Sequence, residues 1–125
     1  MPILNVRSLP QKDPSLIPKA MKATCEAISH VYDCDPKHVW ITWETIEPGF
    51  YLEGNLAEDS QPLATHPPLC QLTCFEGKSP EEIELVLQAA AKTLSESLEI
   101  PNNIFITYHE AKSGRVVDGN GIVRK

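Results

Sequence analysis

The sequence aligns with itself when Pro36 is laid on Pro101. At this offset residues 36–43 (PKHVWITW) lie on residues 101–108 (PNNIFITY), so two runs rich in β-branched and aromatic residues coincide. Such runs are typical of β-strands. Repetition at a fixed period indicates that one supersecondary unit occurs twice in the chain.

The same offset reaches the start of the chain, because it also lays Pro2 on Pro67. A strand, a helix and a parallel strand form a βαβ unit. We therefore expect residues 1–125 to be a single domain of two such units, over about residues 2–52 and 67–123. With 42% apolar residues the chain can bury one core.

The first unit is predicted from its hydrophobic periodicity. Residues 3–7 alternate between two faces, as in a half-buried strand. A helix then follows Ser15 as N-cap, with Pro18 in its first turn. Its apolar stripe consists of Ile17, Met21, Thr24, Ile28 and Val31. The second strand is expected over residues 39–44.

The second unit repeats this pattern. Residues 69–75 read as a strand, and Ser79 with Glu82 forms a capping box that has Pro80 at the first helical position. The apolar stripe of this helix consists of Ile83, Val86, Leu87, Ala90, Leu94 and Leu98. A strand is expected over residues 104–108.

These elements predict an α+β fold, with a four-stranded sheet and two helices on one face. The connecting segments are a short strand at residues 50–52, a loop at 56–68 and a C-terminal hairpin at 115–123. The other sheet face carries Trp40 or Trp43 and lacks a cover. An uncovered apolar face usually marks an interface, so we expect the chain to self-associate.

Composition excludes several classes of partner. The net charge is −6, the pI is near 5.1, and the eleven basic residues are scattered, which argues against nucleic acid. No apolar run is long enough for a membrane span and no signal peptide is visible, so a cytoplasmic protein is expected. This compartment favours free thiols for the four cysteines, which are Cys25, Cys34, Cys70 and Cys74.

The most reactive candidate group is Pro2, which lies one cleavage from the chain terminus. Within the chain its nitrogen is a tertiary amide without a proton. Removal of Met1 would convert that nitrogen to a secondary amine on a rigid ring. An α-amine titrates near 8, and burial or a neighbouring cation lowers its pKa, so Pro2 can act as a general base.

Two other candidate sites are less favoured. His66, Cys70 and Cys74 suggest zinc, but a strand separates the two cysteines by about 13 Å, too far for thiolates that bind at about 2.3 Å. Cys34 as a nucleophile would need His38 as base, and the intervening Pro36 disfavours a helical juxtaposition. We expect no metal and no cofactor.

A terminal Pro2, two βαβ units and a glycine-containing C-terminal hairpin resemble the tautomerase superfamily. Residues 70–82 (CQLTCFEGKSPEE) are similar to the strand, Glu-Gly-Arg-Ser turn and helix start of 4-oxalocrotonate tautomerase. Residues 67–121 are similar to the second half of macrophage migration inhibitory factor. The resemblance implies a long, two-unit member and a homotrimer with three active sites at subunit boundaries.

The resemblance also implies site residues. Pro2 matches the catalytic proline, Lys12 falls near the substrate-binding arginine, and Phe75 falls where an apolar residue lines the pocket. Phe105 and Thr107 fall where a neighbouring subunit contributes an aromatic and a polar side chain.

The sequence also departs from the family pattern. Cys34 and Asp35 replace a basic residue that several members carry. Trp40 and Phe105 replace the arginine of the oxalocrotonate enzymes, which weakens the case for a dicarboxylate substrate. The Arg pair and strand carboxylate of the dehalogenating relatives are not obvious, although Glu44 could stand in as an acid.

Two functions follow from these expectations. The first is a cofactor-independent tautomerase or isomerase, in which Pro2 acts on an enol or 2-oxo acid and a cation such as Lys12 holds the carboxylate. The alternative is a non-catalytic trimer of the same fold that acts as a binding or scaffold protein.

Overall fold

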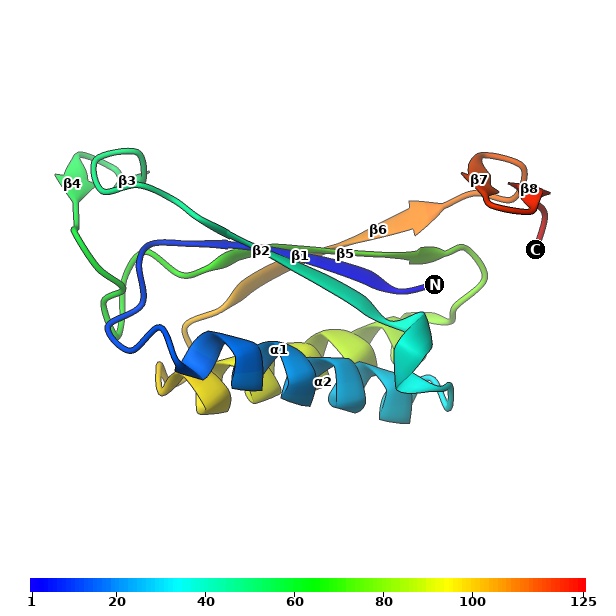
Figure 1. Ribbon diagram of the computed structural model, residues 1–125, viewed down its shortest axis with the longest axis horizontal. Helices are drawn as coiled ribbons and strands as arrows, with labels where there is room; N and C mark the ends of the chain where they lie inside the picture. The colour runs from blue at the N-terminus through cyan, green and yellow to red at the C-terminus, as the bar shows by residue number, and fades with distance from the viewer.

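The computed structural model describes residues 1–125 as a four-stranded sheet covered on one face by two helices (Figure 1). The first half consists of β1 (Ile3–Ser8), α1 (Leu16–Val31), the 3₁₀ helix η1 (Pro36–His38) and β2 (Trp40–Thr45). The second half consists of β5 (Leu69–Phe75), α2 (Pro80–Leu98) and β6 (Phe105–Ala111). The two short hairpins are β3 (Leu52–Glu53) with β4 (Leu56–Ala57), and β7 (Val116–Asp118) with β8 (Gly121–Val123).

The strand order of the sheet is β2-β1-β5-β6. β1 is parallel to β2, β5 is parallel to β6, and the two inner strands β1 and β5 are antiparallel. Each half is therefore one βαβ unit, and a pseudo-two-fold axis between β1 and β5 relates the two units. The predicted α+β fold of duplicated βαβ units is confirmed.

The hydrogen bonds at the strand ends correct the predicted offset. The Trp40 N–H donates to the Pro2 carbonyl at 3.0 Å, and the Phe105 N–H donates to the Pro68 carbonyl at 3.1 Å. Pro2 therefore corresponds to Pro68 and not to Pro67. The first halves of the two units are therefore related by the spacing between Pro2 and Pro68. This spacing is one residue longer than the spacing between Pro36 and Pro101, which the sequence comparison used.

The change of offset falls at the ends of the helices. Asp33 and Glu99 have left-handed backbones with φ of 48° and 59°, and the Pro2-to-Pro68 offset relates them to each other. The first unit then carries one additional residue, Asp35, whose carboxylate accepts a hydrogen bond from the N–H of Lys37 in η1. Beyond this insertion the predicted offset, which lays Pro36 on Pro101, is correct.

The two helices begin differently. The capping box predicted for α2 is confirmed, because the Ser79 hydroxyl accepts from the Glu82 N–H and the Glu82 carboxylate accepts from the Ser79 N–H, both at 3.2 Å. Ser15 precedes α1 as predicted, but its side chain makes no capping bond. The Ser15 hydroxyl instead donates to the Asp13 carboxylate at 2.6 Å.

The core lies between the helices and the sheet. It is built mainly from Leu4, Val6, Ala20, Ile28, Cys70, Leu72, Cys74, Val86, Ala90, Leu94 and Leu98. Trp43 packs against this core, whereas Trp40 projects from the opposite face and is 55% exposed. The tryptophan on the uncovered face is therefore Trp40.

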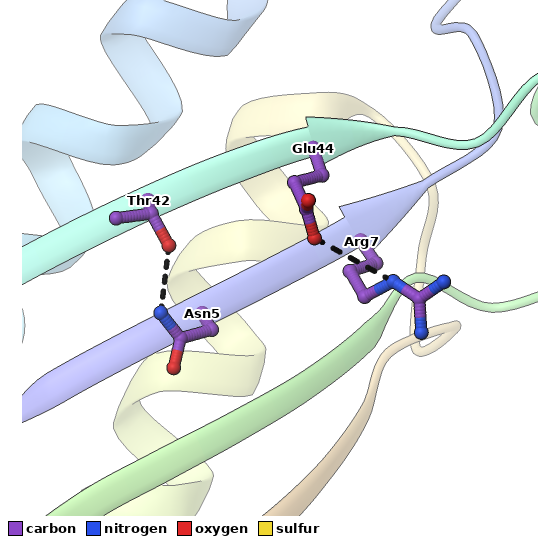
Figure 2. Close-up of polar contacts among 4 residues, drawn as sticks. All are labelled: Asn5, Arg7, Thr42 and Glu44. Carbon is purple, nitrogen blue, oxygen red and sulfur yellow. Dashed lines mark hydrogen bonds and ion pairs between the residues drawn. The ribbon is translucent and has the colours of Figure 1, made fainter.

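The uncovered face is more polar than predicted. In its first two strands Asn5 donates a hydrogen bond to the Thr42 hydroxyl at 2.7 Å, and Arg7 forms an ion pair with Glu44 at 3.7 Å (Figure 2). Large apolar side chains lie on the same face, among them Phe105 on the outer strand β6, which is 54% exposed.

The two hairpins rise from opposite ends of the uncovered side (Figure 1). The strand predicted at residues 50–52 is found at Leu52–Glu53, and Leu56–Ala57, predicted as loop, pairs with it as β4. The predicted C-terminal hairpin is present as β7 and β8. Neither helix is both long enough and apolar enough to cross a membrane.

Candidate active site

A cavity of about 400 Å³ lies where β1 begins and β5 ends. Its walls include Pro2, Tyr32, Cys74, Phe75, Lys78 and Lys125. The N-terminus and the C-terminus both lie at this end of the molecule (Figure 1). The fold thus brings four segments together around this cavity: the first residues of β1, the end of α1, the start of α2 and the C-terminal tail.

Pro2 is buried in the cavity wall, and its carbonyl is fixed by the Trp40 N–H. Met1 precedes it, so the Pro2 nitrogen becomes an amine only when Met1 is removed. Met1 lines the cavity, and burial lowers the pKa of its amine; Lys125 and Lys78 lower this pKa further, while Cys74 and Cys34 oppose the shift. The cavity therefore favours a neutral amine.

Two lysine side chains bring positive charge to this cavity. The Lys78 ammonium lies 4.4 Å from the centre of the Tyr32 ring, and the Lys125 ammonium lies 5.4 Å from the centre of the Phe75 ring. The ion pairs of the structure join Arg7 to Glu44 and Lys92 to Glu96 on α2, so neither cavity lysine has an acidic side chain within ion-pair distance. Both cations are available to a carboxylate ligand.

The C-terminal tail is held against the cavity by hydrogen bonds. The Glu76 carboxylate accepts from the Ser113 N–H at 2.7 Å, and the Ser113 hydroxyl accepts from the Lys125 N–H at 3.1 Å. These bonds place the last residue beside Phe75. They also engage the acidic side chain of Glu76, which lines the same cavity.

Neutral hydroxyl and thiol groups form the inner wall. The Tyr32 hydroxyl lies 3.7 Å from the Cys74 sulfur, within hydrogen-bonding distance. Burial raises the pKa of Tyr32 well above its ordinary value and raises the pKa of the Cys74 thiol. The Tyr32 hydroxyl and the Cys74 thiol therefore stay uncharged at neutral pH, and the charged side chains of the cavity include Lys78, Lys125 and Glu76.

Cys34 and His38 also line the cavity, although Pro36 lies between them. No hydrogen bond joins the Cys34 thiol to His38. All four cysteines are free thiols. The geometry thus offers no activated cysteine nucleophile beside Pro2.

Of the residues implied by the family resemblance, Pro2 and Phe75 lie together in the cavity. Lys12 lies at the other end of β1, where it lines a separate cavity. The Pro2-to-Pro68 offset explains this, because it lays Lys12-Asp13-Pro14 on Lys78-Ser79-Pro80. Within one subunit Lys78 therefore holds, in the Pro2 cavity, the place that Lys12 holds in the separate cavity.

Phe105 and Thr107 also lie away from the Pro2 cavity of their own subunit. Phe105 pairs with Leu69 at the start of β5, whereas the cavity lies at the end of that strand. The Thr107 hydroxyl is 2.8 Å from the His109 ring. Neither residue lines the Pro2 cavity of its own subunit.

Sequence reasoning missed Tyr32, Glu76, Lys78 and Lys125 as cavity residues. The repeated Lys-x-Pro motif could have identified Lys78, because the two copies align once Pro2 is laid on Pro68. Tyr32 carries no motif, and Lys125 reaches the cavity only through the folded tail.

No family model and no curated protein matches the sequence. Several solved structures match its fold. The structure of Pt0534 inactivated by 2-oxo-3-pentynoate is 14% identical, with a TM-score of 0.84 over 97% of this chain and 94% of that one. A fused 4-OT described as a wild-type symmetric trimer is 15% identical, with a TM-score of 0.81 over 97% and 94% of the two chains.

A more distant match is N1, a member of the cis-3-chloroacrylic acid dehalogenase (cis-CaaD) family. It is 11% identical, with a TM-score of 0.79 over 98% of this chain and 84% of that one. Each likeness spans nearly the whole chain and includes both βαβ units. The protein therefore has the fold of the tautomerase superfamily, as that fold occurs in the fused 4-OT and cis-CaaD structures.

Proposed function

We propose that this protein is a cofactor-independent tautomerase in which Pro2, freed of Met1, is the general base. The observation that carries the proposal is the burial of Pro2 in a cavity that holds two unpaired cations, Lys78 and Lys125. The fold supports it, because similar solved structures are a fused 4-OT and a protein inactivated by a 2-oxo acid, 2-oxo-3-pentynoate.

The chemistry is a proton transfer between carbon and oxygen of an enol or 2-oxo acid. The neutral Pro2 amine takes a proton from the enol hydroxyl, and the same proton is returned to the adjacent carbon to give the ketone. The reverse sequence converts ketone to enol. Positioned general-base catalysis accelerates such a transfer by roughly 10² to 10⁴. No electron leaves the substrate, so no redox cofactor is needed.

The cations have two tasks in this proposal. Lys78 and Lys125 bind the substrate carboxylate and stabilise the negative charge that develops on the substrate oxygen. Their fields also disfavour a second positive charge on the amine, which keeps Pro2 in its basic form. Phe75 supplies an apolar wall that excludes water from the reacting atoms.

The proposed active form is a homotrimer. An uncovered sheet face with exposed Trp40 and Phe105 supports self-association, and a similar fused 4-OT is a symmetric trimer. In such an assembly Lys12, Phe105 and Thr107 would act in the cavity of a neighbouring subunit. The substrate is a small carboxylate.

The test compares protein that begins at Pro2 with protein that retains Met1, after intact mass has established which form is present. Both are assayed with enolisable 2-oxo acids, such as phenylpyruvate and 2-oxobutyrate. The processed form should be active and the Met1 form inactive, because an acylated nitrogen cannot accept a proton. Equal turnover by both forms would exclude Pro2 as the base, and inactivity of both would favour the binding or scaffold function.

A further inference from the structure

The Lys78 side chain needs an external support to present its charge at one place. Lysine has four rotatable bonds and a strongly hydrated ammonium, so it orders only where a partner holds it. Lys78 forms no ion pair with an acidic side chain. Its ammonium instead lies 4.4 Å from the centre of the Tyr32 ring, which is well within the range of a cation–π contact.

The Tyr32 ring is itself held in place. Tyr32 is the C-cap residue of α1, and its N–H donates to the Ile28 carbonyl at 3.1 Å. At the other end of the side chain, the hydroxyl lies 3.7 Å from the Cys74 sulfur. Cys74 is 2% exposed and belongs to β5, so the ring is anchored at both its backbone and its hydroxyl.

This anchor ties the ring to the strand that carries Pro2. β1 and β5 pair in antiparallel fashion with Ile3 opposite Thr73, and the next step of the same register brings Pro2 beside Cys74. A continuous set of contacts therefore runs from Pro2 through Cys74 and Tyr32 to the Lys78 ammonium. A ring, unlike a carboxylate, attracts the ammonium without neutralising it.

We propose that Tyr32 is a positioning residue, which holds the Lys78 ammonium at the Pro2 cavity so that it can bind the carboxylate of a 2-oxo acid. This assignment rests on the proposed function for the identity of the ligand. The contact itself is independent of the proton transfer, so it can be tested with a carboxylate that does not react.

The second unit provides an internal comparison. At the Pro2-to-Pro68 offset, Leu98 occupies the position equivalent to Tyr32, and Lys12 occupies the position equivalent to Lys78. Leu98 is buried and ends α2 without an aromatic ring for Lys12. The fold therefore accepts leucine at this place, which makes Tyr32→Leu a suitable variant for removing the ring.

The experiment measures binding of oxamate, a 2-oxo acid analogue without an enolisable hydrogen, by isothermal titration calorimetry. Loss of the cation in Lys78→Met should raise the Kd for oxamate by about tenfold. Loss of the ring in Tyr32→Leu should raise the Kd for oxamate by about threefold to tenfold. Tyr32→Phe retains the ring but loses the hydroxyl contact with Cys74, so its oxamate affinity should lie between those of wild type and Tyr32→Leu.

The double variant Tyr32→Leu/Lys78→Met separates positioning from general structural damage. If Tyr32 acts through Lys78, the double variant should bind oxamate no more weakly than Lys78→Met alone. An equal loss from Tyr32→Leu in both backgrounds would overturn the proposal. Wild-type affinity in Tyr32→Leu or in Lys78→Met, or the absence of oxamate binding to wild type, would overturn it as well.

The same variants distinguish this inference from the proposed function. With a turnover substrate, Tyr32→Leu should raise KM and also lower kcat, because Lys78 both binds the carboxylate and stabilises the charge that develops on the substrate oxygen, and Lys78→Met should lower both parameters in the same direction. If wild-type protein turns over no 2-oxo acid but the oxamate coupling is present, the tautomerase proposal fails and the positioning role stands. If turnover depends on Pro2 but the oxamate coupling is absent, the positioning role of Tyr32 fails and the tautomerase proposal stands.

Discussion

At the scale of single residues, the proposed chemistry depends on the position of one ring nitrogen. Pro2→Ala leaves a primary amine after Met1 removal, but on a backbone that is free to rotate. We expect kcat/KM for a 2-oxo acid to fall by roughly 10² while the fold is retained. The matched control is Pro68→Ala, because Pro68 occupies the equivalent place in the second unit with an internal amide nitrogen. Equal losses in both variants would contradict the role of Pro2.

The charge of Lys125 predicts a pH effect. Burial lowers the pKa of an amine in this cavity, and Lys125 and Lys78 lower it further, so the basic form is present from a pH below the ordinary value of about 8. Lys125→Met removes one positive charge and should raise the pKa of the Pro2 amine. The acid limb of the kcat/KM profile should then move to higher pH.

The control for this profile is Lys112→Met, which removes a charge from the same tail but outside the cavity. Its acid limb should coincide with that of wild type. A limb that moves to lower pH in Lys125→Met, or moves equally in both variants, would show that the cation does not act on the base.

At the scale of elements, comparing the two helices shows how much an N-cap side chain contributes to the free energy of unfolding. Ser79→Ala removes the hydroxyl that accepts from the Glu82 N–H, and should lower the free energy of unfolding by about 1 kcal/mol. Ser15→Ala is the matched control, because Ser15 makes no side-chain capping bond and should have a much smaller effect. Urea unfolding of both variants measures the difference, and equal losses would contradict the capping role.

The capping box also has a pH dependence of defined sign. Hydrogen bonds from the Ser79 N–H and side chain lower the pKa of Glu82. A group whose pKa is lower in the folded state stabilises the fold above its unfolded pKa and loses that contribution as pH falls. Ser79→Ala retains the backbone N–H, which makes the larger contribution, so the difference in free energy of unfolding between this variant and wild type should shrink in acid only by the smaller, side-chain part.

The elements show what sequence could and could not predict. Hydrophobic periodicity and the Ser79 capping signal placed α2, and β5 was predicted at its observed bounds. The offset of the first strand was wrong by a single position, because the inserted Asp35 leaves no visible gap in the letters. Lys78 was not predicted, because the resemblance pointed to Lys12, which is its equivalent in the other unit and lies at the opposite end of the sheet.

At the scale of the whole molecule, duplication produces two related cavities of unequal chemistry. The second, of about 140 Å³, is lined by Lys12, Leu98 and Ile100, and Gln61 from the loop after β4 enters it. Its equivalent proline, Pro68, is internal, so no cleavage of the first residue can free its nitrogen. The pseudo-symmetric scaffold thus supports one basic amine per chain.

The uncovered sheet face predicts the oligomeric state. Trp40 is 55% exposed in the single subunit, and a trimer that buries it should dissociate when a charge replaces the ring. Sedimentation equilibrium should give a trimer for wild type and a smaller species for Trp40→Glu. The control is Leu85→Glu, at a residue of similar exposure on α2. A monomeric wild type at micromolar concentration would exclude the proposed assembly.

The assembly also makes a prediction about where each site is completed. Phe105 lies at the far end of β5 from the Pro2 cavity of its own subunit, so any contribution that it makes to catalysis must come from a neighbour. Pro2→Ala and Phe105→Ala should each impair activity as pure trimers. When the two proteins exchange subunits, a site regains both native side chains wherever a Phe105→Ala subunit lies beside a Pro2→Ala subunit in the correct order.

For random exchange at equal concentrations, about one site in four meets this condition in a cyclic trimer. The mixture should therefore recover roughly a quarter of wild-type activity, well above either parent. The control mixes Pro2→Ala with Phe75→Ala, because Pro2 and Phe75 line the same cavity within one subunit. In that mixture a subunit with native Pro2 always lacks native Phe75, so no recovery is expected. Recovery in the control, or none with Phe105→Ala, would show that the sites are not shared between subunits in this way.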